Sequence, residues 1–124
     1  MLYRGSCHCG AVEFEVDADL SQVVRCNCSI CRRKGAIMCR VPEQNFTLLK
    51  GREDLTLYQF NSMRAEHYFC RHCGIYPYHR TFRDPNMLAI NVGCLDGVDP
   101  FKLQVKEFDG RSLPTVSDQT GLSS

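Results

Sequence analysis

The grouping of the cysteines is the feature of this sequence that most restricts its fold. Seven of the nine cysteines stand close together along the chain in three groups. The groups are Cys7 with Cys9, Cys26 with Cys28 and Cys31, and Cys70 with Cys73. Sulfurs bound to one tetrahedral zinc ion lie roughly 3.8 Å apart, which cysteines spaced in this way reach easily. An odd number of cysteines cannot all pair as intramolecular disulfides. The spacing therefore predicts a fold built around metal ions.

The seven grouped cysteines divide into a set of four and a set of three. Glycine follows the last cysteine of the first and third groups, where a positive φ lets the chain curl and aim amide groups at sulfur. We therefore predict one closed structural zinc site, whose ligands are Cys7, Cys9, Cys70 and Cys73. Cys26, Cys28 and Cys31 then form a second zinc site with a fourth position open to water, a substrate sulfur or another side chain. Catalytic metal sites keep such a position.

Other arrangements of these cysteines are also compatible with their spacing. A single zinc ion with spare reduced cysteines, disulfides or an iron–sulfur cluster would also use closely spaced thiols. Cys39 lies in an apolar segment and is expected to be a small buried side chain, or else a fourth ligand of the second site. The four histidines show no ligand spacing and are expected on the surface or supporting the ligands.

Positive charge is concentrated around the second cysteine group. No acidic residue stands between Leu20 and Pro42. Five basic residues do, and they are Arg25, Arg32, Arg33, Lys34 and Arg40. Cations beside thiols favour thiolates and also bind carboxylates. Arg25, Arg32, Arg33 and Lys34 are therefore predicted to bind an acidic thiol ligand, with a solvated basic face as the alternative.

Length and charge restrict the class of protein. A chain of 124 residues is one domain by the usual scaling, and its net charge of +1 argues against a generally basic nucleic-acid binder. We expect a polar tail over residues 111–124 after a domain over residues 4–110. No secretory leader or apolar span is expected, so we expect no membrane partner and a reducing, cytoplasmic location, where clustered cysteines bind metal or do chemistry.

Period-two alternation predicts mainly β structure. Val12, Phe14 and Val16 alternate with acidic residues, which is typical of a strand with one buried face. Short runs rich in β-branched and aromatic residues, separated by turn residues, predict an all-β meander. The predicted strands are 11–17, 36–41, 46–49, 55–60, 67–70, 75–81, 87–92 and 103–108. The only predicted helix is Ser29 to Lys34, stopped by Gly35.

Three segments resemble the glutathione-dependent formaldehyde-activating family, which includes centromere protein V. They are GSCHCGAV from Gly5, CNCSICRR from Cys26 and FCRHCG from Phe69. The segment from Asn91 to Gly97 is similar to a late family motif. Its Cys94 stands where the formaldehyde-activating enzymes carry threonine, as in the centromere protein V-like branch. This cysteine is expected to be buried, with a reactive thiol near the second site as the alternative.

The resemblance implies a fold and an activity. The fold is Mss4-like, a zinc-binding arrangement of several small coiled antiparallel sheets. The activity is carbon–sulfur chemistry of the lyase class, in which glutathione adds to formaldehyde to give S-hydroxymethylglutathione. The resemblance also implies the same division into structural ligands and a second, catalytic zinc held by Cys26, Cys28 and Cys31.

Two classes of function follow from the sequence. In the first, the second zinc presents glutathione or a similar thiol to a small aldehyde, and no protein general base is evident. In the second, the chain is a non-catalytic, zinc-stabilised module that binds an acidic protein or, less favoured, nucleic acid. A further alternative makes both zinc ions structural. Exposed strand edges leave a monomer or a homodimer as the expected state.

Overall fold

The computed structural model describes residues 1–111, so the predicted polar tail lies outside the described residues except for Arg111. Ten strands, one α-helix and several single 3₁₀ turns make up this part of the chain. In chain order the strands and the helix are β1 (Leu2–Ser6), β2 (Glu13–Asp17), β3 (Val23–Cys26), α1 (Ser29–Lys34), β4 (Met38–Pro42), β5 (Phe46–Lys50), β6 (Leu55–Tyr58), β7 (Glu66–Cys70), β8 (Tyr78–Arg80), β9 (Met87–Asn91) and β10 (Val105–Phe108). The prediction of a mainly β protein is confirmed.

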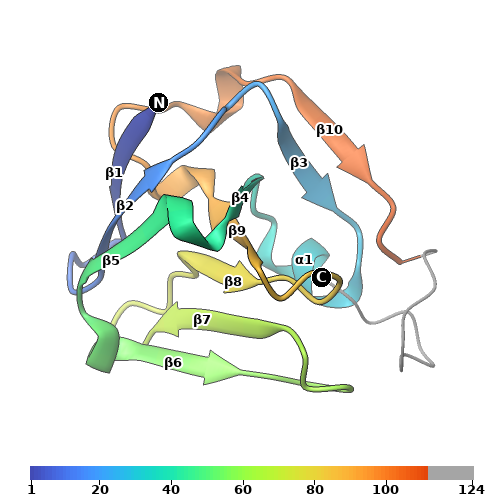
Figure 1. Cartoon of the computed structure of the whole chain (residues 1–124), viewed down its shortest axis with the longest axis horizontal. Coiled ribbons are helices and arrows are strands. Elements are labelled where there is room, and N and C mark those ends of the chain that lie inside the picture. The colour runs from blue at the N-terminus through green and yellow to red at the C-terminus, as the bar shows by residue number, and fades with distance from the viewer. Residues whose placement is uncertain (112–124) are drawn as a thin grey trace.

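The strands form two sheets (Figure 1). The smaller has the order β1-β2-β5, and the larger has the order β10-β3-β4-β9-β8-β7-β6. Every named pair is antiparallel except β10 with β3, which is parallel. The predicted meander is therefore wrong where β10 pairs with β3, and also where β4 pairs with β9 and β2 with β5, since these neighbours are not consecutive in the chain. After β9 the chain crosses the molecule through the short helical turns Val92–Cys94 and Pro100–Lys102, and β10 pairs beside β3 rather than beside β9.

Eight of the ten strands overlap the predicted ones, and β1 and β3 are absent from the prediction. β1 has only one fully buried residue, Gly5, and β3 is four residues long, so neither shows a clear period of two. The predicted helix is confirmed with its bounds. Its last turn ends at Gly35, whose φ of +66° and amide bond to the Cys31 carbonyl form the expected C-terminal cap.

The main core lies where the two sheets meet. Val12, Phe14 and Val16 of the alternating segment are fully buried, as predicted. Phe46 bridges the sheets, because its ring centroid lies 5.3 Å from that of Phe14 and 4.5 Å from that of Tyr78 on β8. These aromatic contacts fix the small sheet against the larger one.

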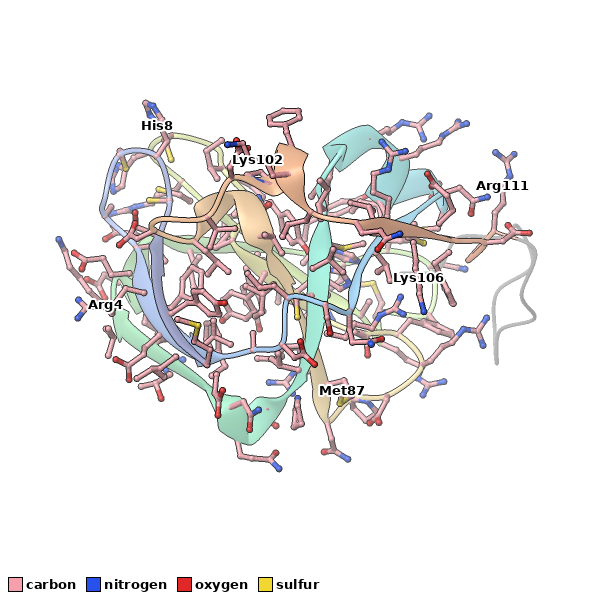
Figure 2. All side chains as sticks on the ribbon, turned by 90° about the horizontal axis from the view of Figure 1, so that it is seen from above. Arg4, His8, Met87, Lys102, Lys106 and Arg111 are labelled. Carbon is pink, nitrogen blue, oxygen red and sulfur yellow. The ribbon has the colours of Figure 1, made fainter. Side chains whose placement is uncertain are left out.

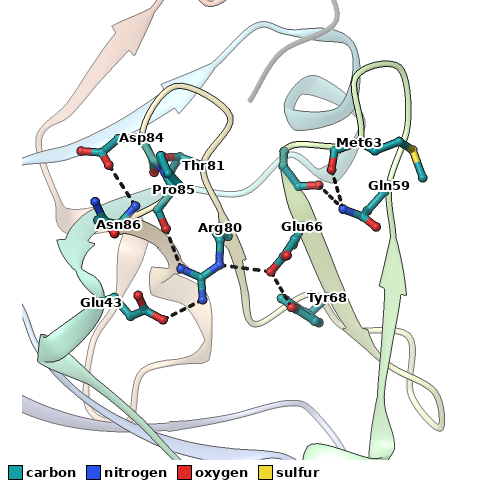
Figure 3. Close-up of polar contacts among 11 residues, drawn as sticks. Glu43, Gln59, Met63, Glu66, Tyr68, Arg80, Thr81, Asp84, Pro85 and Asn86 are labelled. Atoms are coloured by element: carbon teal, nitrogen blue, oxygen red, sulfur yellow. Dashed lines mark hydrogen bonds and ion pairs between the residues drawn. The ribbon is translucent and has the colours of Figure 1, made fainter.

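Arg80 stabilises the strand and turn connections at one side of the larger sheet (Figure 3). Its guanidinium donates to Glu66 at 3.1 Å, to the Pro85 carbonyl at 2.6 Å and to Glu43 at 2.8 Å. Tyr68 donates to the same Glu66 carboxylate at 2.8 Å. A single planar side chain therefore joins β7, the turn after β8 and the short helical turn that follows β4.

Gly51 offers a direct test of how tightly the chain after β5 packs against the segment from Ala11 to Val12. Its φ is +90°, and a Cβ there would overlap the Ala11 carbonyl beside the first cysteine pair. We expect Gly51→Ala to lower the free energy of unfolding by about 2–4 kcal/mol, from backbone strain and the clash. Gly97 is the matched control, because its φ is +74° but no atom lies within 4 Å of the position that a Cβ would take. Gly97→Ala should cost about 1 kcal/mol. Urea unfolding measures both free energies, and equal losses would contradict the tight contact of Gly51 with Ala11.

Candidate metal centres

The first cysteine cluster joins two turns that are distant in sequence. Cys7 and Cys9 lie in the connection from β1 to β2, Cys70 ends β7, and Cys73 lies in the turn before β8. All four sulfurs lie within 4.8 Å of one another. The Cys9 sulfur is 3.7 Å from those of Cys7 and Cys70, which matches the roughly 3.8 Å expected between thiolates on one tetrahedral ion.

Backbone amides surround the sulfurs of this cluster. Gly10 and Gly74 have φ values of +81° and +77°, as predicted for the residues that follow each cysteine pair. The curled chain lets the Val12 amide donate to the Cys7 sulfur at 3.3 Å and the His72 amide donate to the Cys70 sulfur at 3.4 Å. Amide donors favour the thiolate form, which is the form that binds metal. The four residues therefore fit a closed metal site.

The second cluster contains three buried cysteines from a strand end and a helix start. Cys26 ends β3, Cys28 is the residue before α1, and Cys31 lies in α1. Their sulfurs lie within 4.8 Å of one another. Gly110 closes over Cys26, since a Cβ at Gly110 would lie 2.7 Å from this sulfur. The end of β10, at Phe108, and the residues that follow it therefore pack on the cluster.

The close sulfurs of the second cluster change one another's pKa values through hydrogen bonds. Hydrogen bonds from the Cys28 and Cys31 thiols hold the pKa of Cys26 well below its usual range, against the effect of burial. The same contacts with Cys26 and Cys28 raise the pKa of Cys31. A metal ion would replace the shared protons. Among residues 1–111 no fourth His, Cys, Asp or Glu joins this cluster, so its donor set leaves one position of a tetrahedron to another ligand.

Cys39 and Cys94 lie outside both clusters. Cys39 is buried in the main core, and its thiol donates to the Asp19 carbonyl at 3.5 Å. The alternative that it completes the second site is therefore not supported, and the prediction of a small buried side chain holds. Cys94 is also buried in the main core. Burial raises its pKa to about 12, which keeps its thiol protonated.

The four predicted anion-binding residues do not form one patch. Arg25 and Arg32 line a cavity of about 240 Å³ together with Cys26 and Cys31. Arg25 also forms a 2.7 Å ion pair with Glu107 of β10. Arg33 and Lys34 line a separate cavity on the other side of α1. The helical turn separates side chains that are adjacent in sequence, and only the first pair shares a cavity with the cysteine cluster.

A smaller cavity of about 140 Å³ also reaches Cys26. Its mostly apolar wall includes Met87 and Phe108, and Arg40 lies with its guanidinium 4.5 Å from the Phe108 ring centroid. The second cluster therefore borders a charged cavity on one side and a largely apolar one on another. This pairing of environments is not evident from the sequence, because Met87 and Phe108 are distant from the cysteines along the chain.

Two histidines predicted as surface or supporting residues are buried beside α1. His67 of β7 and His79 of β8 are directly opposed strand residues, and their rings stack at 4.6 Å between centroids. Lys34 Nζ lies 2.7 Å from His67 Nδ1, and the Tyr76 hydroxyl lies 2.6 Å from His79 Nδ1. The signal in the sequence is the strand alternation around both histidines. His8 and His72 are exposed.

The two clusters lie toward opposite ends of the molecule. Figure 2 shows His8, which lies between Cys7 and Cys9 of the first cluster, far from Arg111 along the long axis. The Arg111 amide donates at 3.1 Å to Asn27, which lies between Cys26 and Cys28. The described residues include no helix long and apolar enough to cross a membrane.

The family model for "Glutathione-dependent formaldehyde-activating enzyme" matches residues 2–110. The chain belongs to this family. A curated relative from Halomonas elongata, named "Putative glutathione-dependent formaldehyde-activating enzyme", is 34% identical over 82 residues, which cover 59% of this chain and 52% of the relative. The chain thus spans about half the length of this relative. A crystal structure of a Rhodobacter sphaeroides protein is similar at 44% identity and a TM-score of 0.82, covering 85% of this chain and 99% of that one.

In this member of the family, the first cluster should contribute most to stability. We expect Cys73→Ser to lower the free energy of unfolding by more than about 3 kcal/mol and to release metal, because the link between two distant turns is lost. Cys94→Ser is the matched control, since it also removes a thiol but lies outside both clusters. It should cost about 1 kcal/mol and retain metal. Thermal unfolding with elemental analysis measures both, and equal effects would contradict a structural first site.

Proposed function

We propose that this chain is a zinc-dependent enzyme of the carbon–sulfur lyase class. It binds glutathione or a similar thiol and adds it to a small aldehyde such as formaldehyde, giving S-hydroxymethylglutathione. Family membership and the name of the Halomonas relative support the substrate class. The observation that carries the proposal is the buried set of three sulfurs, which borders two cavities and has no fourth protein ligand among residues 1–111.

The donor sets support zinc at both clusters. Thiolates select zinc, copper(I) or iron–sulfur clusters over hard cations, and tetrahedral zinc accepts either four cysteines or three with one exchangeable position. Cys7, Cys9, Cys70 and Cys73 would hold the structural ion, and Cys26, Cys28 and Cys31 would hold the catalytic one. When bound at the second cluster, zinc supplies a Lewis acid that favours the thiolate of an incoming thiol.

The protein's own residues orient the two substrates. Arg25 and Arg32 stand at the charged cavity beside Cys26 and Cys31, where they would bind a carboxylate of glutathione. Arg33 and Lys34 add positive charge on the far side of α1. The second cavity, where Met87 and Phe108 lie beside Arg40, Arg83 and Asp84, has room beside Cys26 for a small aldehyde.

The addition itself balances without a protein base. A sulfur electron pair forms the new bond to the carbonyl carbon, the carbonyl electron pair moves to oxygen, and the proton lost by the thiol neutralises that oxygen. The Cys-rich clusters must remain reduced, so we place the reaction in the cytoplasm.

Glutathione binding tests this proposal by calorimetry on the zinc-loaded chain. We expect heat with glutathione and none with S-methylglutathione, whose sulfur cannot become a thiolate. Arg32→Gln should weaken binding by about threefold to tenfold, because the guanidinium is exposed and its charge is screened. Arg4→Gln is the matched control, because Arg4 lies at the far end of the molecule from Arg111 (Figure 2). No heat with glutathione at millimolar concentration would overturn the proposal.

Cys28→Ser separates an open second site from a purely structural one. An exchangeable site should lose glutathione binding and its metal while the fold persists, as judged by circular dichroism. Unfolding as severe as that of Cys73→Ser would instead make both sites structural.

One observation favours the second candidate, a non-catalytic binding module. Arg25 near the end of β3 and Arg32 and Arg33 in the last turn of α1 are all exposed. If they bind an acidic protein or nucleic acid, affinity for an acidic polymer should fall steeply as salt rises from about 50 to 200 mM. Fluorescence anisotropy with labelled single-stranded DNA and with a polyglutamate peptide measures this. We expect no binding of either polymer by the enzyme at about 150 mM salt.

A further inference from the structure

Lys34 is held in unusual surroundings for a lysine. It is the last residue of α1, and its ammonium nitrogen lies 2.7 Å from His67 Nδ1 and 3.4 Å from the centroid of the Tyr76 ring. Among the described residues no carboxylate forms an ion pair with it. The other three lysines, Lys50, Lys102 and Lys106, are exposed. Lys34 is therefore the one lysine held by an imidazole and an aromatic face.

The groups around Lys34 come from three segments. His67 belongs to β7, Tyr76 and His79 to β8 and the segment before it, and Cys28 and Cys31 to the start of α1. Burial is the main cause that lowers the pKa of both histidines, to about 3 for His67, so both imidazoles are neutral. A neutral His67 must accept its hydrogen bond from a protonated Lys34 through Nδ1. Electrostatic attraction to the sulfurs of Cys31 and Cys28 favours the charged form of Lys34 and raises its pKa, against the larger effect of burial.

The side chain also borders a cavity suited to a small apolar molecule. Lys34 lines an open cavity of about 280 Å³, whose wall includes Ile30, Tyr58, Tyr68 and Phe69. Aromatic and aliphatic walls disfavour the charged amine and favour reactions that release water. The cavity is reached from solvent and lies apart from the two that border Cys26.

We propose that Lys34 is a covalent capture site for small aldehydes, which it binds as an imine in this cavity. The amine electron pair forms a bond to the carbonyl carbon, and the carbonyl electron pair moves to oxygen. A proton passes from nitrogen to oxygen and gives a carbinolamine. The nitrogen electron pair then expels the hydroxyl group as hydroxide, and the proton that remains on nitrogen passes to it, giving water and the imine. Only the aldehyde is shared with the proposed function, since neither metal nor thiol takes part.

The acid–base state of Lys34 supports this chemistry. Burial lowers its pKa to about 8, with the sulfurs of Cys31 and Cys28 acting in the opposite direction. At about pH 7.5 such an amine is roughly one quarter neutral, whereas an exposed lysine is neutral in about one molecule in a thousand. His67 Nδ1 also holds one N–H of the amine, which orients the nitrogen electron pair.

Reductive trapping tests the inference on the full zinc-loaded chain without glutathione. An equimolar amount of formaldehyde with sodium cyanoborohydride converts an imine into N-methyl-lysine, which peptide mass spectrometry locates. At about pH 7.5 we expect Lys34 to be methylated at least about tenfold faster than Lys50, Lys102 or Lys106. Methylation of Lys34 at the same rate as the exposed lysines, or more slowly, would overturn the inference.

Variants give matched controls. Lys34→Arg should abolish the fast phase and leave the rates at the other lysines unchanged, while Lys106→Arg should leave the fast phase intact. The wild-type peptide map decides the question even if Lys34→Arg does not fold. A chain that binds glutathione but shows no preference for Lys34 overturns this inference alone. A chain that traps aldehyde at Lys34 but gives no heat with glutathione overturns only the proposed function.

Discussion

The convergence of four cysteine sulfurs at one end of the molecule is the constraint on which the rest of the fold depends. Sulfurs 3.7 Å apart join the turn after β1 to the turn after β7, and so join the smaller sheet to the larger one. A chain of this size buries only a modest core, and a metal ion held at this cluster would add folding free energy that such a core lacks. Gly51 packs so tightly against Ala11, two residues after Cys9, that a Cβ there would overlap the Ala11 carbonyl. The chain around the first cluster therefore leaves little space.

The second cluster has similar chemistry but different surroundings. Its three sulfurs come from β3 and α1, and the end of β10 packs on Cys26 through Gly110. β10 reaches this position because it pairs in parallel with β3, which is the one departure from antiparallel pairing among the named strand pairs of residues 1–111. The feature absent from the predicted meander is therefore the feature that forms one wall of the candidate active site. Phe108 of the same strand supplies the apolar surface beside Cys26.

Local sequence predicts those parts of the site that depend on local geometry. The spacing of Cys7 with Cys9 and of Cys70 with Cys73 indicates the first cluster, and glycine after each pair indicates the curl. The end of α1 follows from Gly35, whose left-handed conformation caps the helix. The parts that local sequence does not predict depend on strand pairing. The opposition of His67 and His79 across β7 and β8, and the cavity wall formed by Met87 and Phe108, arise only when distant segments meet. The basic residues near α1 look like one group in the sequence. They separate into two cavities only because the helix turns their side chains to different sides.

The short helix α1 explains how two distinct environments lie so close together. Cys31 and Lys34 are three residues apart, so both lie on the side of the helix that faces the interior of the protein, while Arg32 and Arg33 diverge to opposite cavities. The sulfurs of Cys28 and Cys31 favour the charged form of Lys34, although burial outweighs them. Placing an ammonium group in a partly buried position is costly unless hydrogen bonds or opposite charges compensate it. His67 and the face of Tyr76 compensate part of that cost. Lys34 therefore gives up its proton more easily than an exposed lysine, and its amine borders an open cavity.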